Sequence, residues 1–213
     1  IKILNNLPKI IPIFPLEGVV IFPNTYLPLN IFESRYLKMI DKALASENRL
    51  IGMIQPITAS KNLDVSYYNV GCAGKIIKFE EVEESRYLIT LKGLNRFNLL
   101  KEKTNNNNFK VAEIDWSNFT QDLQKEKIKE GFSNLKVALK KYFQVKDIRV
   151  NTKIIDSCKD YNLVDQITMI CPLASEEKQL LLETLSIKKR NALLLSMIES
   201  YTSEASISDV IKH

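Results

Sequence analysis

The sequence predicts an α+β protein in which a β-rich N-terminal half is followed by an α-helical half. Up to about Trp116 the apolar residues mostly alternate or form short runs, whereas from about Thr120 they recur at helical spacing. The chain has 213 residues, of which 45% are apolar, which is ample for at least one buried core. We therefore expect a β-rich domain at 1–116, a linker at 117–121 and a helical subdomain at 122–213.

The segment from Ile11 to Tyr36 is the most informative part of the β-rich half. Proline fixes φ and removes a hydrogen-bond donor, so the prolines of this segment exclude a helix and favour short edge strands. Directly after it the period changes, which predicts one helix. The prolines are Pro12, Pro15, Pro23 and Pro28, and the helical positions are Tyr36, Leu37, Ile40, Ala43 and Leu44.

Eight strands are expected in the β-rich half. They lie near residues 10–14, 18–22, 26–31, 50–55, 70–80, 86–92, 95–100 and 109–115. The acidic run Glu80 to Ser85 and the polar tract Lys103 to Asn108 are read as hairpin tips, and Gly93 to Asn95 as a further turn.

The helical half begins with a long amphipathic pattern that predicts a helix of six or seven turns containing Gly131. Its apolar stripe consists of Ile128, Phe132, Leu135, Leu139, Tyr142 and Phe143. Further helices are expected near residues 151–158, 162–170, 175–184 and 187–201. Asn162, Ser175 and Ser186 are their expected capping residues.

Composition argues against metal and redox chemistry. Cys72, Cys158 and Cys171 have no C-x-x-C spacing and are expected to be reduced thiols. His213 is the only histidine and is the last residue, so we expect no metal site and no Ser-His pair. The net charge of +5 is spread over both halves; the clusters Lys140-Lys141 and Lys188-Lys189-Arg190 are expected on solvated helix faces.

The sequence contains no P-loop, no G-x-S-x-G elbow and no G-x-G-x-x-G turn. The stretch from Gly71 to Ile76 is the nearest match to a phosphate-binding loop, but its glycines are too close and no hydroxyl residue follows Lys75. We interpret it as a strand with small residues for close packing. A Ser-Lys pair is not excluded by pattern, but nothing favours one. We therefore expect no enzymatic activity, no catalytic residue and no cofactor.

Two groups of residues are candidates for binding, although the sequence does not identify a binding site. The aromatic residues of the proline-rich segment serve either as core fillers or as a platform for an extended peptide, and the core is favoured. They are Phe14, Phe22, Tyr26, Phe32 and Tyr36. Arg35 and Arg96 each lie beside an aromatic residue, and pairing with a carboxylate such as Glu17 or Glu33 is favoured over ligand contact.

The chain has no apolar run of the roughly 18 residues that a membrane span requires, and no basic region leads into an apolar signal segment. We therefore expect a cytoplasmic protein that does not bind membranes. The first residue is Ile1 rather than methionine, so the sequence leaves open whether the native chain extends further.

Several motifs occur in the order known from one family. The run PIFPLEGVVIFPNTYLPLNIFESRYLKMI is followed by VGCAGKI, an acidic hairpin, LITLKGLNRFNLL and the C-terminal NLVDQITMICPLASEEKQLLLETLSIKKRNALLLSMIE. This series resembles the N-terminal substrate-recognition domain of Lon-type ATP-dependent proteases. The motif IFESRY is closer to the standalone bacterial proteins of that domain, which lack the ATPase and peptidase parts.

The resemblance implies a PUA-like pseudo-barrel packed with one helix, followed by a helical bundle, and a module that binds polypeptide. We expect a non-catalytic protein that binds unfolded or extended segments, or a protein partner such as a separate protease. In this interpretation the ligand lies on apolar side chains of the β half, in the cleft against the helical half and along a free strand edge. Two alternatives stay open: an RNA-binding PUA-like module and a regulatory fragment of a Lon-type serine protease.

Overall fold

A computed structural model describes residues 7–57, 66–82, 85–123, 131–149, 155–156 and 160–211. The chain divides into two compact units. The first consists of Ile1–Lys125 and Pro172–Glu183, and the second of Glu126–Cys171 and Thr184–His213. None of the described helices is both long and apolar enough to cross a bilayer.

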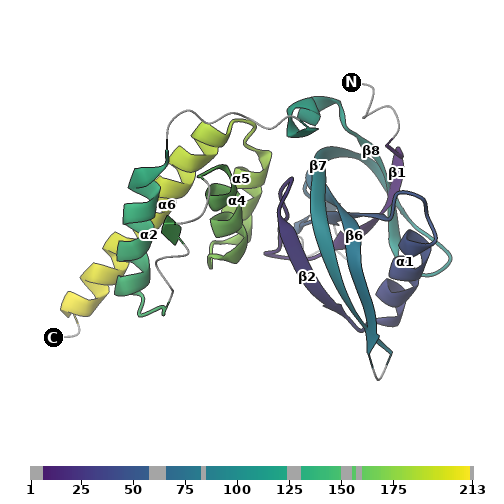
Figure 1. The fold of residues 1–213 in the computed structure, drawn as a ribbon, viewed down its shortest axis with the longest axis horizontal. Helices are drawn as coiled ribbons and strands as arrows, with labels where there is room; N and C mark the ends of the chain where they lie inside the picture. The colour runs from purple at the N-terminus through teal and green to yellow at the C-terminus, as the bar shows by residue number, and fades with distance from the viewer. Residues whose placement is uncertain are drawn as a thin grey trace. The chain divides into compact units, whose positions relative to one another are not determined.

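The first unit is built on a mixed sheet that closes into a ring. The strands are β1 (Ile10–Pro15), β2 (Tyr26–Ile31), β3 (Leu50–Ile54), β6 (Val70–Val82), β7 (Arg86–Thr104) and β8 (Lys110–Asp115), with a small hairpin of β4 (Pro56–Ile57) and β5 (Ser66–Tyr67). Their order is β2-β7-β6-β3-β1-β8, and an additional β7–β8 pairing closes the ring. Among the described strands, β1 and β3 are the one pair that runs parallel. Figure 1 shows β6 and β7 side by side along their length, with β2 next to β7.

The strand predictions hold with two corrections. The expected strand at 18–22 is not a strand, although Val20, Ile21 and Phe22 are buried there. Backbone groups of this segment bond outside any ladder: Gly18 N–H donates to the Gln55 side chain at 2.9 Å. The expected turn at Gly93 to Asn95 is also wrong, because β7 runs through it without interruption.

Gly93 is required by a close approach and not by a turn. A Cβ at this position would lie 1.9 Å from the Phe22 carbonyl oxygen. Phe22 to Thr25 form a tight turn in which Pro23 comes first and Asn24 takes φ of 64°, as the second central position of a type II turn needs. Hydrogen bonds from Asn24 N–H to Gly93 O and from Gly93 N–H to Thr25 O, both 2.9 Å, then attach the turn to β7.

Both predicted hairpins are confirmed by the strand pairing, but each tip is shorter than predicted, because Glu80 to Val82 belong to β6 and Lys103 and Thr104 belong to β7. β6 pairs with β7 up to Val82 opposite Arg86, although Glu83 and Glu84 of the acidic tip lie outside the described residues. β7 pairs with β8 up to Thr104 opposite Lys110, with the rest of the polar tract as its tip. The near match to a phosphate-binding loop lies in β6 and is buried except for Lys75, as expected for a strand with small residues.

The interior of the ring is filled by apolar side chains from every strand of the ring and by the tryptophan that follows β8. They are Ile11, Ile13, Leu50, Ile54, Ala73, Phe97, Ala112, Ile114 and Trp116. The predicted helix is α1 (Ser34–Leu44), which buries Tyr36, Met39, Ile40 and Ala43. A single apolar stripe therefore holds α1 on the unit.

The segment expected as a linker is part of the first unit. Residues Ser117–Leu123 form the 3-10 helix η2, which buries Phe119 and packs against β7. Helix α5 (Ser175–Glu183), expected in the helical subdomain, also belongs to this unit. The boundaries at 116 and 122 thus differ from the observed units, because η2 and α5 pack on the sheet. That the two units are separate folding domains stays a prediction.

Polar contacts attach α5 to the sheet. Gln179, which is 2% exposed, accepts from Gln55 Nε2 and donates to the Val70 carbonyl, each at 3.0 Å. Lys178 Nζ donates to the Gly18 carbonyl at 3.0 Å. Because these side chains are buried and bonded, α5 has a fixed register on the first unit.

The second unit contains α2 (Ser133–Val145), α4 (Asp160–Ile170) and α6 (Ile187–Ile211), and both α2 and α4 contact α6. The predicted stripe on α2 is confirmed for Leu135, Leu139, Tyr142 and Phe143, while Ile128 lies outside the described residues. Whether these helices form a bundle stays a prediction. Residues 155–156 are helical, and the rest of the predicted helix 151–158, including Cys158, lies outside the described part.

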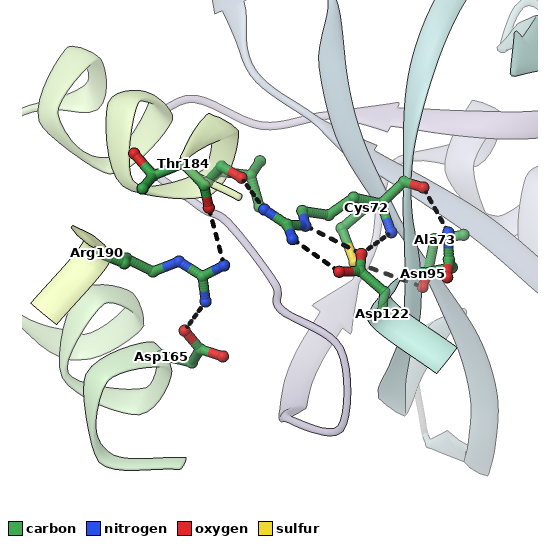
Figure 2. A network of polar contacts seen from close by, with 9 residues as sticks. Cys72, Ala73, Asn95, Asp122, Asp165, Thr184 and Arg190 are labelled. Atoms are coloured by element: carbon green, nitrogen blue, oxygen red, sulfur yellow. Dashed lines mark hydrogen bonds and ion pairs between the residues drawn. The ribbon is translucent and has the colours of Figure 1, made fainter. Parts of the chain in front are cut away.

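Three details of the second unit correct the predictions. Gly131 precedes α2 and is not inside it, so this helix is shorter than expected. Asn162 lies within α4 and does not cap it, since α4 begins at Asp160. Arg190 is 4% exposed and not solvated, because its guanidinium pairs with Asp165 and donates to the Thr184 carbonyl at 3.0 Å (Figure 2).

Candidate binding surface on the β-sheet arm

The aromatic residues singled out in the sequence fall into two groups. Phe14, Phe22 and Tyr36 are buried, and Phe14 and Tyr36 stack with ring centroids 4.4 Å apart. Tyr26 and Phe32, by contrast, are 55% and 70% exposed. The core interpretation is therefore correct for three of the five, and only Tyr26 and Phe32 are available to a ligand.

Arg35 pairs with a neighbouring carboxylate, as favoured from the sequence. Its NH2 lies 2.8 Å from Glu33 Oε2, and its guanidinium lies over the Tyr36 ring at 4.6 Å. Burial raises the pKa of the Tyr36 phenol, which the nearby Arg35 lowers to a smaller extent. The Arg35 and Glu33 side chains are half exposed, and their ion pair stabilises the start of α1. None of its contacts indicates a ligand.

Arg96 is buried and structural. Its carboxylate partner is Asp122 of η2, and neither Glu17 nor Glu33. Nε and NH2 donate to the two carboxylate oxygens at 3.0 and 2.7 Å, and NH1 donates to the Leu182 carbonyl at 2.9 Å. Figure 2 shows Asp122 in this network beside Cys72 and Asn95. Because every direction around the guanidinium is occupied, Arg96 is not a ligand-binding residue.

Chemistry-bearing clusters are not found in the described residues. No group of three His, Cys, Asp or Glu side chains within the described ranges could hold a metal ion. Cys72 and Cys171 are buried thiols in the reduced state. These observations direct attention to exposed surfaces.

Several exposed apolar side chains of the sheet lie where β2, β7 and β6 run together. We call this three-stranded part the arm, comprising Tyr26–Ile31, residues 86–92 and residues 75–82. Residues directly opposite each other on paired strands lie on the same face. One face of the arm carries three rows across the strands, and we call it the arm face. The rows are Tyr26–Lys92–Lys75, Pro28–Thr90–Lys78 and Asn30–Leu88–Glu80.

Burial confirms that the arm face is turned to solvent. On β7, Ile89 and Leu91 lie on the face opposite the arm face and are 2% and 0% exposed. Leu88 lies on the arm face and is 41% exposed. Tyr26 and Leu88 thus place apolar area in water, and Phe32 continues the same alternation just past the end of β2. Exposed apolar groups that lie together in this way indicate an interaction surface.

The arm also has a free strand edge, because β2 is the last strand in the order and, among the strands that the structure describes, pairs with β7 alone. The bond from Gly93 N–H to Thr25 O turns the Thr25 carbonyl toward β7. Antiparallel ladders alternate, so Leu27, Leu29 and Ile31 also turn their backbone groups to β7.

The remaining residues of β2 direct their backbone groups to the free edge. Tyr26 and Asn30 each present an N–H and a carbonyl there, and Pro28 presents a carbonyl alone. Pro28 consequently costs the β2–β7 ladder no hydrogen bond, which explains why the strand tolerates it. The half-buried Leu27 and Leu29 lie along the same edge on the opposite face.

The charges of the arm face are uneven. Lys75, Lys78 and Lys92 are exposed, and none forms an ion pair with a carboxylate of the residues that the structure describes. Lys75 and Lys92 are direct cross-strand neighbours. Glu80 is the acidic residue among the three rows, and it lies in the row farthest from Tyr26.

Sequence reasoning identified Tyr26 and Phe32 but missed the rest of the arm face. Leu88, Thr90 and Lys92 alternate with Ile89 and Leu91, so the alternation of Arg86 to Lys92 held the signal. What it could not show is which strand lies beside which, and therefore that the lysines of two strands meet.

Comparison with known proteins agrees with this architecture. Residues 10–200 match the family described as the ATP-dependent protease La (LON) substrate-binding domain. The chain is 27% identical over 193 residues to a Lon protease of Desulfosudis oleivorans and 27% identical over 198 residues to one of Syntrophus aciditrophicus. Each alignment covers 87% of this chain, but only 23% and 24% of the relative, so the chain spans about a quarter of these proteases.

Two solved structures share the fold. The N-terminal domain of a Mycobacterium avium complex Lon protease superposes with a TM-score of 0.63, covering 92% of this chain and 98% of that one. A Lon N-terminal domain protein from Xanthomonas campestris gives 0.64, covering 89% and 98%. Both are 17% identical to this chain, which is a likeness of fold.

The chain thus has the fold of Lon N-terminal domains. The chain belongs to the family of Lon (protease La) substrate-binding domains.

Proposed function

We propose that this chain is a non-catalytic recognition module that binds unfolded or extended polypeptide by adding it as a strand to the free edge of β2. The observation that carries the proposal is the alternation on β2, which directs the backbone groups of Tyr26, Pro28 and Asn30 away from β7. Strand addition obtains affinity from main-chain hydrogen bonds and selectivity from alternate side chains.

The side chains around the edge favour an apolar segment. A strand added to β2 places alternate residues beside exposed Tyr26 and Phe32 on the arm face, and beside half-buried Leu27 and Leu29 on the other. Both faces of the added strand would therefore cover apolar area. Segments with exposed apolar residues and unpaired backbone are characteristic of unfolded chains, which supports them as the class of ligand.

Backbone pairing is tested by removing a free-edge N–H without touching the β2–β7 ladder. The variant is Asn30→Pro, because the Asn30 N–H points away from β7, and its matched control is Asn30→Ala, which loses the same side chain but keeps the N–H. The probe is a reduced and alkylated, permanently unfolded protein, with binding measured by fluorescence anisotropy.

We expect Asn30→Pro to weaken binding about tenfold, which corresponds to one hydrogen bond of roughly 1.4 kcal/mol, and Asn30→Ala to leave affinity within about twofold. Thermal unfolding of both variants checks that the fold is kept. Equal affinities for the two variants would contradict pairing at this edge, and absence of binding by the unaltered protein would contradict the function.

One observation favours a second candidate, an RNA-binding module. Tyr26 lies in one row with Lys92 and Lys75, and an exposed aromatic ring beside cations is the composition of a base-stacking platform. A salt titration separates the two functions. Phosphate contacts make affinity fall steeply with ionic strength, whereas apolar strand addition responds weakly.

The similarity to Lon proteases also suggests how the module would be used. It would deliver bound polypeptide to a protease, either as a regulatory part of a longer Lon-type chain or through a separate partner. Co-purification from native cells, with Asn30→Pro as the negative control, tests whether bound polypeptide and a protease are recovered together.

A further inference from the structure

We infer that the segment bound at the arm is acidic as well as apolar, with its carboxylates attracted by the positive charge of Lys92 and, one strand further away, of Lys75 and Lys78. This inference rests on the proposed function and specifies its ligand class. It is carried by charge complementarity on the arm face.

Two lysines of the arm face are direct cross-strand neighbours. Lys75 of β6 and Lys92 of β7 are directly opposite in register, and like charges in that position destabilise a strand pair. Lys78 lies on the same face in the adjacent row. None of the three pairs with a carboxylate of the described residues, so their charge is not compensated within the part of the chain that the structure describes. A carboxylate from a ligand would remove this repulsion.

Tyr26 connects the lysines with the strand edge. It is the β2 member of the row that contains Lys92 and Lys75, so a strand added to β2 places one residue of its arm-face side next to the Tyr26 ring. An added strand lies two strand spacings from Lys92 and three, about 14 Å, from Lys75 and Lys78. The flexible stem of Lys92 can therefore reach a carboxylate across β2, while Lys75 and Lys78 add positive charge from one strand further away. Rows are two residues apart along a strand, so acidic residues at alternate positions of the ligand meet the rows of Lys92 and Lys78 in turn.

The arm face also gives the ligand a direction. Its lysines lie in the rows of Tyr26 and Pro28, whereas Glu80 lies in the row of Asn30, toward the tip that includes Glu81. The acidic residues of the ligand are therefore expected at the Tyr26 end and neutral or basic residues at the tip.

The test uses three labelled synthetic octapeptides in fluorescence anisotropy with the full chain. One alternates leucine with glutamate, the second replaces every glutamate by glutamine, and the third replaces it by lysine. The protein variants are the triple change Lys75→Gln, Lys78→Gln and Lys92→Gln, and a control triple change at exposed lysines away from the arm, Lys38→Gln, Lys101→Gln and Lys103→Gln. Both remove three positive charges, so they differ only in where the charge is lost.

We expect the glutamate peptide to bind about tenfold more tightly than the glutamine peptide at low salt, and the lysine peptide to bind weakest. The glutamate advantage should shrink in high salt and disappear in the arm variant, but persist in the control. If the glutamine peptide binds as tightly as the glutamate peptide, the inference is overturned while the proposed function stands.

Two other outcomes are also decisive. If none of the peptides and no unfolded protein binds, the proposed function fails and the inference fails with it. If a single-stranded homopolymeric RNA displaces the glutamate peptide and binds more tightly than it, with affinity lost in the arm variant, the lysines serve phosphate and the inference of an acidic polypeptide is wrong.

Discussion

Arg96 and Asp122 form a two-point ion pair inside the first unit, with side chains only 2% and 5% exposed. Asp122 also accepts from the Arg96 backbone N–H at 2.9 Å, and the guanidinium lies 4.7 Å from the Phe119 ring. Arg96 of β7 therefore holds η2 through both the Phe119 ring and the Asp122 carboxylate. Through the Leu182 carbonyl it also holds α5.

Breaking this pair from one side should be costly. Asp122→Ala leaves the guanidinium buried without its counter-charge, so we expect a loss of about 3–5 kcal/mol in the free energy of unfolding. Arg96→Met with Asp122→Ala should cost less than the sum of the single changes, because no unpaired charge remains. Urea unfolding of the four proteins of the cycle gives the coupling energy, and additive losses would show that the two residues do not act as a pair.

Gly93→Ala should destabilise strongly, because the new Cβ meets the Phe22 carbonyl, a backbone atom that cannot rotate away. We expect about 3 kcal/mol or more in urea unfolding. Gly74→Ala is the matched control in the same sheet, because its new Cβ would lie 3.0 Å from the Leu91 Cβ, a much milder overlap than the 1.9 Å at Gly93. If both substitutions lowered the free energy of unfolding by the same small amount, the turn from Phe22 to Thr25 would not pack against Gly93.

Gln179→Leu should loosen α5 from the sheet. The substitution leaves the Val70 carbonyl without its donor and removes one of the two acceptors of the Gln55 amide, which still donates to the Ser175 carbonyl; we expect a cost of about 1–3 kcal/mol. Amide hydrogen exchange should accelerate in α5 and in η2 more than in α1. Glu176→Gln, an exposed change on the same helix, serves as control and should leave the exchange of α5 unchanged.

Alkaline pH should destabilise the first unit partly through Tyr36. Burial raises the pKa of its phenol above the ordinary 10.0, so the unfolded chain loses this proton at a lower pH than the folded protein does. The stabilising contribution is thus complete below pH 10.0 and is lost as the pH rises through the folded-state pKa. Tyr36→Phe should make the unfolding free energy fall less steeply above pH 10; an unchanged slope would contradict this assignment.

Much of the fold follows from local sequence rules. Alternation located β1, β2, β3 and β8, and the period of 3.6 located α1 and the stripe of α2, because each of these elements buries one continuous face. The predictions failed where tertiary contacts override local signals. Gly93 looks like a turn residue but serves a close approach, and residues 18–22 are apolar without forming a strand because their backbone bonds elsewhere.

The polar contacts of the core could not be predicted from the sequence. Asp122 lies 26 residues from Arg96, and Gln179 lies 124 residues from Gln55, so no local pattern joins them. The same holds for the arm face, where Tyr26 is visible in the sequence as an aromatic residue, but its row with Lys92 and Lys75 exists only through strand register.

The central claim, strand addition at β2, is tested most directly by residue-resolved amide hydrogen exchange in the presence of a reduced and alkylated unfolded protein. The amides of Tyr26 and Asn30 point away from β7 and should exchange at least about tenfold more slowly when the ligand is bound, while those of Leu27 and Leu29 are already protected by the ladder. Binding without any change in the exchange of the Tyr26 and Asn30 amides would contradict the account.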